Sequence, residues 1–413
     1  MTGARSARFP FGLAALLGVW GLTRLTLLLF VAKVYVFPGP DVTSDVSVIY
    51  HGWYEVLRHG AFPLNDVTWQ YPPAASLAVL SPGLLPFLDY PHAFFVLAFV
   101  ADLVVFGLLL YAGSRSGKTR RGTWVWVIGV PLLGPTVYAR YDVMVTAVAV
   151  AALLAGARHP RVMGVLVGFG AMVKVWPVLL LVAAVRRRAG GWTAATAGAS
   201  AVLFWTTMPG AFAFLAFQRV RGTEVESLGA LVFHVARHHG WNGRVLLNYG
   251  SVEFLGPYVD LVSTAALVLT SLAFGWLLLW RLCAKRFLTH TLADAAFVAV
   301  LMFTATSRVI SPQYLVWLVG LAAVCLCFRA SRMAVPAWLV LIACFVTVLE
   351  FPVWFADVVG STPLGITLLV VRNGLLVIAA LLAARVLWRG TVSEPARALP
   401  AQAARTKETL ASS

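Results

Sequence analysis

The residues best suited to catalysis or binding stand in a polar stretch that ends in Trp-Gln-Tyr-Pro-Pro at 69–73. Two aspartates, Asp41 and Asp45, open this stretch directly after a long apolar run. A carboxylate at that position can act as a general base on a hydroxyl group. Asp45 is our candidate, with Asp41 as the alternative. Asp45 can also be a first-turn acid that complements a helix dipole, and the residues by themselves favour this second interpretation.

Three cations occur at breaks between apolar runs, where an anionic group could bind. Arg140 lies in Tyr-Ala-Arg-Tyr-Asp at 138–142, Arg308 lies in Ser-Arg-Val-Ile-Ser-Pro-Gln-Tyr at 307–314, and Lys174 lies in Lys-Val-Trp-Pro. The planar guanidinium group suits phosphate. The alternatives are structural, because Arg140 could pair with Asp142 at the surface and Arg308 could be a snorkelling anchor.

Other polar residues give weaker signals. His234, His238 and His239 have spacings i, i+4 and i+5, so two of them could share a helix face, but a metal site also needs ligands in fixed geometry, and we expect none here. Arg24 and Asp102 stand inside apolar runs, where charges are costly and often functional, and the two could simply pair with each other. Phosphate-binding loops and dinucleotide fingerprints are missing from the sequence, which argues against ATP-driven transport.

The composition requires that a membrane positions these residues. The chain has 413 residues, of which 60% are hydrophobic and 12% charged, and its mean hydropathy is +0.85. This predicts an all-α polytopic membrane protein. The net charge of +16 then reflects Lys and Arg gathered on cytosolic loops and does not indicate nucleic acid. We expect membrane segments at 11–36, 92–113, 123–139, 142–157, 162–185, 191–209, 258–281, 291–307, 313–328, 334–350 and 364–388.

Basic clusters flank the segment 162–185 on both sides, which a single crossing does not allow if both clusters face the cytosol. Pro177 interrupts this segment beside Lys174, so we interpret it as a broken, re-entrant pair of half-helices with Lys174 near the tip. The total is then about 12 membrane segments, with both termini cytoplasmic. Segments 37–91 and 210–257 lie outside, and the tail 390–413 is expected to be disordered. A short amphipathic helix capped by Ser44 should start near Asp45.

These motifs together resemble the GT-C superfamily of membrane glycosyltransferases, and family 87 in particular. The residues that carry the resemblance are the acid at 45 before Tyr50, the stretch ending in Trp-Gln-Tyr-Pro-Pro, Ala-Arg-Tyr-Asp-Val at 139–143, Lys-Val-Trp-Pro at 174–177, Arg-Gly-Thr-Glu-Val-Glu-Ser-Leu at 221–228 and Ser-Pro-Gln-Tyr at 311–314. The resemblance covers roughly residues 11–388 and implies a GT-C domain over 1–389.

The resemblance implies transfer of mannose from polyprenyl phosphate mannose, with inversion, to a hydroxyl of a cell-envelope glycolipid or lipoglycan. Asp45 would be the general base, and Arg140, Arg308 and Lys174 would bind the donor phosphate. No cofactor is expected, and the transfer would need no metal. Further substrate contacts would come from Tyr50, Trp69, Tyr71, Asp142, Arg221, Glu226, His234 and Gln313.

Two other functions stay open at this point. A transporter or flippase of a lipid-linked sugar would place its charges near mid-membrane and show two related halves. A non-catalytic scaffold would have no need of Asp45, Arg140, Arg308 and the Trp-Gln-Tyr-Pro-Pro stretch. Arabinose or glucose would meet the requirements of these motifs as well as mannose does, so all three sugars stay open.

Overall fold

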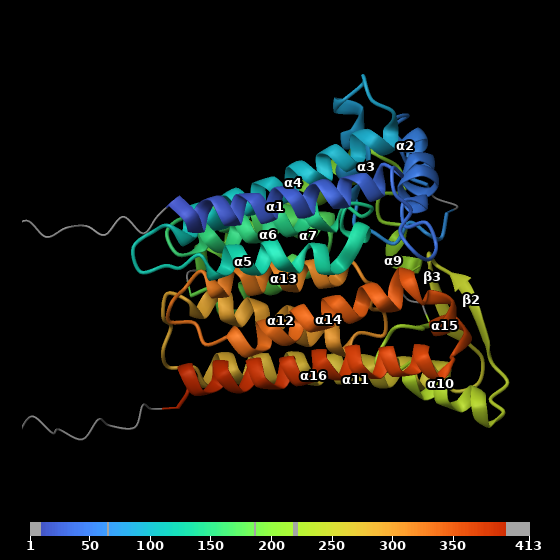
Figure 1. Cartoon of the computed structure of the whole chain (residues 1–413). Helices are drawn as coiled ribbons and strands as arrows, with labels where there is room; N and C mark the ends of the chain where they lie inside the picture. Colours follow the sequence, from blue (N-terminus) through green and yellow to red (C-terminus); the bar gives the residue numbers. More distant parts are fainter. Residues whose placement is uncertain (1–9, 64–65, 186, 218–221, 394–413) are drawn as a thin grey trace, which may run out of the picture.

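The computed structural model describes residues 10–63, 66–185, 187–217 and 222–393. Long helices run side by side, and the short elements gather at one end of this bundle, on the right in Figure 1. We call it the loop end. The long helices are α1 (Pro10–Val31), α4 (Tyr90–Gly113), α5 (Arg121–Gly129), α6 (Asp142–Gly156), α7 (Pro160–Val173), α8 (Arg187–Thr207), α11 (Val259–Cys283), α12 (Thr291–Thr306), α13 (Tyr314–Leu326), α14 (Ala334–Val348) and α16 (Pro363–Thr391).

Shorter helical elements connect the bundle or cover the loop end. They are η1 (Asp45–Tyr50), α2 (His51–Leu57), α3 (Ala75–Leu80), η2 (Ser81–Leu84), η3 (Pro131–Val137), η4 (Trp176–Ala183), α9 (Phe214–Phe217), α10 (Leu231–Ala236), η5 (Arg237–His239), η6 (Leu349–Val353) and α15 (Phe355–Gly360). The start of α1 and the end of α16 both lie at the opposite end of the bundle (Figure 1).

Every predicted membrane segment is helical over most of its length. Within the described residues, five helical stretches are long and apolar enough to cross a membrane: Gly12–Val31, Tyr90–Gly113, Val259–Cys283, Ala334–Val353 and Pro363–Thr391. Other apolar helices, such as α13, are shorter and buried between their neighbours. The all-α polytopic prediction is confirmed, whereas the number of membrane segments stays a prediction.

The chain breaks and returns at Lys174, as the sequence predicts. Lys174 has extended backbone dihedral angles after α7, and η4 then packs back against α7, with Pro177 close to Gly170. Gly164 contacts Ala189 while Gly168 contacts Thr193 and Thr196, so α7 and α8 run parallel to each other. Because α7 and α8 are parallel, the segment between them, which contains η4, must return to the end of the bundle where α7 begins. The flanking basic clusters therefore lie at the same end of the bundle.

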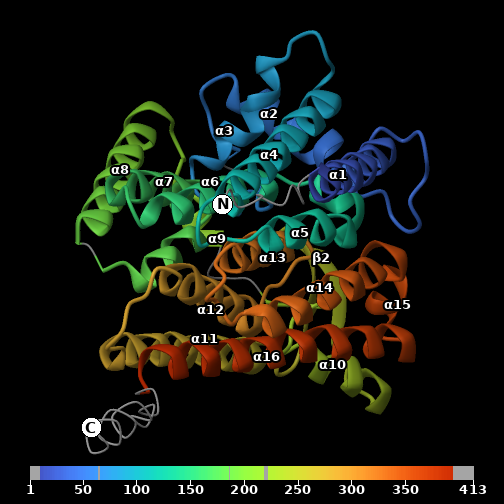
Figure 2. The same cartoon turned by 60° about the vertical axis from the view of Figure 1, so that its left-hand side comes forward.

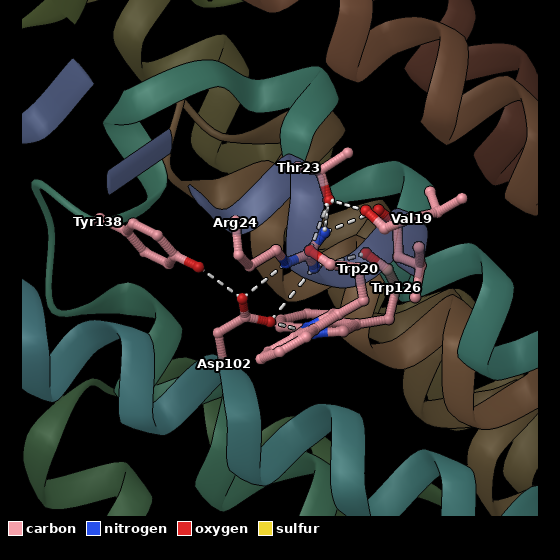
Figure 3. A network of polar contacts seen from close by, with 8 residues as sticks. Val19, Trp20, Thr23, Arg24, Asp102, Trp126 and Tyr138 are labelled. Atoms are coloured by element: carbon pink, nitrogen blue, oxygen red, sulfur yellow. Dashed lines mark hydrogen bonds and ion pairs between the residues drawn. The ribbon is translucent and has the colours of Figure 1, made fainter. Parts of the chain in front are cut away.

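A buried polar network joins α1 and α4 within the bundle (Figure 3). Nε of Arg24 lies 2.8 Å from Oδ2 of Asp102, and both side chains are almost fully buried. The carboxylate of Asp102 also accepts hydrogen bonds from the Trp126 indole and, at 2.6 Å, from the Tyr138 hydroxyl. The structural interpretation of these two intramembrane charges is confirmed. Because Tyr138 directly precedes Ala139 and Arg140, the network also fixes the start of that turn.

Three local features differ in detail from the sequence analysis. A small sheet lies at the loop end of the otherwise helical chain, in the order β1 (Thr223–Glu224), β3 (Ser251–Leu255), β2 (Arg244–Asn248), with both pairs antiparallel. Ser44 makes no side-chain cap among the described residues, because its hydroxyl donates to the carbonyl of Asp41, and the helix begins as a π-helical turn. At the other terminus α16 continues to Thr391, past the predicted boundary at 390; residues 394–413 lie outside the described chain.

Candidate active site

A cavity of 610 Å³ opens at the loop end between the bundle and the short elements. This volume lies within the range of small-molecule sites. Its wall includes four stretches that are far apart in the sequence: the stretch after α1, the turn around Lys174, the β-sheet segment and the turn around Arg308. Of the predicted site residues, the wall contains Asp41, Asp45, Tyr50, Tyr71, Arg140, Lys174, Glu226, Arg308 and Gln313.

Asp45 and Arg140 form an ion pair on this wall. Nη2 of Arg140 lies 2.7 Å from Oδ2 of Asp45, whose side chain is 33% exposed. Nη1 of Arg140 donates to the carbonyls of Val42 and Ala139, so the guanidinium is held on two sides. The structural alternative, in which Arg140 pairs with Asp142, is not what the structure shows, because Asp142 pairs with Lys174 instead. The arrangement leaves a carboxylate of fixed direction facing the cavity.

Asp41, the alternative base, has other partners. Its carboxylate pairs with Lys33 at 2.8 Å and accepts two hydrogen bonds from Thr43. Partial burial raises the pKa of the Asp41 carboxyl, but the hydrogen bonds from Lys33 and Thr43 outweigh it and hold this pKa below its usual value. Both oxygens of Asp41 are engaged, Oδ1 by Thr43 and Oδ2 by Lys33, whereas the pair of Asp45 with Arg140 engages Oδ2. This geometry favours Asp45 over Asp41 as the residue that could receive a proton.

Lys174 lies in the break between α7 and η4 and is surrounded by aromatic rings. Its Nζ is 2.7 Å from Oδ1 of Asp142, and the same oxygen accepts a hydrogen bond from the Trp317 indole. Nζ also lies 5.0–5.5 Å from the ring centroids of Tyr71, Tyr141, Tyr314 and Trp317. Asp142 is buried behind Lys174 and is not among the wall residues. Its role in this geometry is to position Lys174, and the expected contact of Asp142 with substrate does not fit.

The Trp-Gln-Tyr-Pro-Pro stretch supplies Gln70, Tyr71 and Pro72 to the wall. Trp69 is buried and packs edge-on against Trp53, so the expected contact of Trp69 with substrate does not fit this geometry. Trp53 lines the cavity instead, and its indole donates to Asp66 at 2.7 Å. At the far side of the stretch, the amide of Ala74 bonds to the carbonyl of Met172 in α7. The stretch is therefore a rigid support between α2 and the lysine turn.

Arg308 and Gln313 come from the break between α12 and α13. Nη1 of Arg308 donates to the Ser263 hydroxyl in α11 at 3.0 Å, and the Arg308 carbonyl accepts from the amide of Glu224 in β1. The hydroxyl of Ser311 also bonds to Glu224. These contacts join the sheet to the helix break, so that Arg308, Glu224 and Gln313 share one part of the wall.

His234 is fully buried away from the cavity, and its predicted contact with substrate does not fit the structure. One ring nitrogen lies 2.7 Å from the Ser361 hydroxyl, the other 2.8 Å from the Val225 carbonyl. Burial lowers the pKa of His234 to about 4, so the ring is neutral at ordinary pH. His238 bonds to the Ser361 carbonyl. These histidines fix the sheet to α15. Arg221, also predicted at the site, lies outside the described residues.

The sequence analysis missed several wall residues. Tyr314, Trp317 and Trp176 stack in a row along the wall, with ring centroids 4.1 and 5.0 Å apart. Their only sequence signal is their position beside the Pro-containing breaks. Glu350 and Arg372, which pair behind Glu226, gave no signal because they stand in apolar segments. Among the described residues, no three His, Cys, Asp or Glu side chains are grouped to hold a metal ion.

The fold and the site define a polytopic helical membrane protein with a cavity at one end of its bundle, lined by charged, aromatic and apolar side chains. Residues 69–312 match glycosyltransferase family 87, which is more than half of the chain. The chain belongs to glycosyltransferase family 87, and the predicted resemblance is confirmed. It is therefore a membrane glycosyltransferase.

Among solved structures the chain is similar to ArnT from Cupriavidus metallidurans bound to undecaprenyl phosphate, with 12% sequence identity, a TM-score of 0.44, and coverage of 91% of this chain and 77% of that one. This likeness is too distant to transfer a ligand. Curated protein sequences give no match.

Proposed function

We propose that this glycosyltransferase moves a mannosyl residue from polyprenyl phosphate mannose to a hydroxyl of a cell-envelope glycolipid or lipoglycan. The transfer occurs on the extracytoplasmic side, inverts the anomeric configuration and uses no metal. The observation that carries the proposal is the Asp45–Arg140 pair on the wall of a cavity that also contains Lys174 and Arg308. A carboxylate next to several cations suits a reaction in which a hydroxyl loses a proton and a phosphate departs.

The proposed mechanism is a single displacement. The acceptor oxygen attacks the anomeric carbon while its proton passes to the free oxygen of Asp45. The bond from the anomeric carbon to the phosphate oxygen breaks, and polyprenyl phosphate leaves with the bonding electrons. Negative charge grows on that phosphate, and Arg140, Arg308 and Lys174 stabilise it, since fixed cations in a partly dry site need no reorganisation.

An apolar portion of the wall supports a lipid-linked donor. It is formed by α9, α11 and α12, through Phe214, Leu215, Leu267 and Phe303. Lipid and sugar could therefore occupy one continuous cavity, with the isoprenoid against this apolar portion and the sugar near Asp45. The aromatic row of Tyr314, Trp317 and Trp176 offers flat faces beside it.

The test uses purified protein in liposomes with radiolabelled polyprenyl phosphates that carry mannose, glucose or arabinose, and an envelope lipid extract as acceptor. We expect label from mannose in a lipid product, unchanged by EDTA. Asp45→Asn should transfer none, whereas Asp41→Asn should transfer as wild type does. Transfer only from another sugar would replace the proposed donor. Movement of the donor between leaflets without any transfer would replace the enzyme with a flippase.

A further inference from the structure

The hairpin of β2 and β3 extends from a small apolar core to the cavity at the loop end (Figure 1). At its base, Phe254 is buried in this core and its partner Val245 packs against the core. Two positions nearer the turn, Leu247 and Val252 pair with each other and line the cavity. Alternate side chains of a strand point to the same face. One face of the hairpin therefore covers the core at its base and the cavity at its tip.

The turn at the tip contains only Tyr249 and Gly250, because Asn248 and Ser251 on either side of it are still paired. Both turn residues have positive φ, 49° at Tyr249 and 78° at Gly250, as a two-residue hairpin turn of this kind requires. Glycine and asparagine adopt positive φ readily, whereas a bulky side chain there is an outlier. Tyr249 therefore strains the turn, and strained positions of this kind gather at functional sites.

The turn is held in place from two directions. The two residues that flank it, one on each strand, donate hydrogen bonds to the carboxylate of Glu253 at 3.2 and 3.1 Å. The tip also lies against the stretch before Trp69, because a Cβ added at Gly250 would be 3.6 Å from the Cβ of Thr68. Thr68 and Gly250 both line the cavity. The position of Tyr249 on the wall is therefore fixed by contacts other than those of its own ring.

The side chain of Tyr249 is partly exposed and lines the cavity with Leu247 from the same strand. The face of an aromatic ring carries partial negative charge, which attracts the weakly positive C–H groups of a sugar ring and repels a phosphate. The isoprenoid already has an apolar portion of the wall at α9, α11 and α12. Among the groups that the proposed reaction brings into the cavity, a sugar ring suits Tyr249 best.

We infer that Tyr249 is a sugar-binding residue, whose ring stacks on the C–H face of a pyranose in the cavity. This inference rests on the proposed function and adds a residue that recognises the sugar by its shape. Asparagine or glycine would form the turn with less strain, so the turn itself gives no reason for a tyrosine. The pyranose belongs either to the donor or to the acceptor, and the experiment has one arm for each.

The substitutions are chosen so that stability and sugar binding change in different directions. Tyr249→Asn removes the ring and places a favoured residue in the turn, whereas Tyr249→Phe keeps the ring and removes the hydroxyl. Tyr258→Asn is the matched control. Tyr258 also has positive φ, at 66°, but it is 72% exposed and is not among the wall residues.

The donor arm compares the Kd of polyprenyl phosphate mannose with that of sugar-free polyprenyl phosphate. The acceptor arm measures the KM of a synthetic alkyl α-mannoside in transfer. We expect Tyr249→Asn to weaken one of these sugar-dependent values by about tenfold and to leave the Kd of the sugar-free lipid unchanged. Its unfolding midpoint should equal or exceed that of the wild type. Tyr249→Phe should stay within about threefold of wild type, and Tyr258→Asn should change neither sugar-dependent value.

Four results would overturn the inference. If Tyr249→Asn keeps both sugar-dependent values, Tyr249 binds no sugar. If it weakens the sugar-free lipid equally, the ring contacts the isoprenoid. If it lowers the unfolding midpoint, the ring is a packing element of the fold. If Tyr249→Phe loses as much as Tyr249→Asn, the hydroxyl acts and stacking does not.

In all four cases, transfer of mannose by the wild type would leave the proposed function intact. If the wild type neither prefers a glycosylated donor nor transfers sugar, the proposed function and this inference fall together.

Discussion

Nη2 of Arg140 and Oδ2 of Asp45 lie 2.7 Å apart although the two residues come from distant parts of the sequence. The arginine is buried and bonded to the carbonyls of Val42 and Ala139, whereas the aspartate is partly exposed to the cavity. Arg140 therefore has two roles in the proposed mechanism: it aims Asp45, and it adds positive charge next to the departing phosphate.

Replacing Arg140 by lysine tests the geometry of this pair. Arg140→Lys keeps the charge but cannot bind the backbone carbonyls and Asp45 together, because a single ammonium replaces the planar fork. We expect kcat to fall by at least about tenfold, a change equivalent to about 1.4 kcal/mol in the transition state. Arg58→Lys, an exposed change directly after α2, is the control. Wild-type turnover by Arg140→Lys would show that charge alone matters.

Substitutions at Lys174 and Asp142 distinguish an effect on stability from an effect on catalysis. Lys174→Met leaves the buried Asp142 without its cation, and we expect a loss of about 3–5 kcal/mol in the free energy of unfolding. The double variant Lys174→Met/Asp142→Asn removes the stranded charge and should regain most of this loss. Transfer should stay impaired in the double variant, because the phosphate lacks Lys174. Thermal unfolding in detergent measures the effect on stability, and the transfer assay measures the effect on catalysis. A double variant with wild-type transfer would contradict phosphate binding by Lys174.

The network of Arg24 and Asp102 should behave as a purely structural pair. Asp102→Ala strands a buried arginine and removes the partner of Tyr138, so we expect a loss of about 3–5 kcal/mol. The double variant Arg24→Met/Asp102→Leu should be more stable than either single variant, as measured by unfolding midpoints. Its KM for donor should equal that of the wild type. Strictly additive losses in the double variant would contradict a direct pair.

His234 makes stability depend on pH. The pKa of His234 is about 4 in the folded chain and 6.5 when exposed, so the unfolded state binds the extra proton between these values. Stability contributed by neutral His234 is present above pH 6.5 and decreases as the pH falls towards 4. The full loss is about 3 kcal/mol, from about 1.4 kcal/mol per pH unit. His234→Gln should flatten this part of the curve of unfolding midpoint against pH, and an unchanged slope would contradict the assignment.

Features determined by local sequence were predictable. The apolar runs predicted the helices closely, and the Lys-Val-Trp-Pro break between two basic clusters predicted the return of the chain at Lys174. Both follow from local rules, namely helix length, proline and the distribution of charge. Arg24 and Asp102, two opposite charges inside apolar runs, also indicated a buried pair.

Partnerships across the fold were not predictable. Arg140 pairs with Asp45 in place of nearby Asp142, and His234 bonds to Ser361 in α15. Such choices depend on how helices pack, which no local pattern encodes. The sheet was missed because β1 has only two residues, and the Glu350–Arg372 pair was missed because each residue is isolated in its own apolar segment.

The cavity wall extends from Pro40 to Phe355, beyond both limits of the family match at 69 and 312. Chimeras of related enzymes joined at those limits would separate Asp45 from Arg140 and Glu226 from Arg372. Crossovers around Lys118 and Lys285, at the far end of the bundle, would separate the same two pairs. Exchange of specificity between relatives should therefore succeed when the whole wall from Pro40 to Phe355 is transplanted together with its supporting Arg372, and fail when residues 69–312 are moved alone.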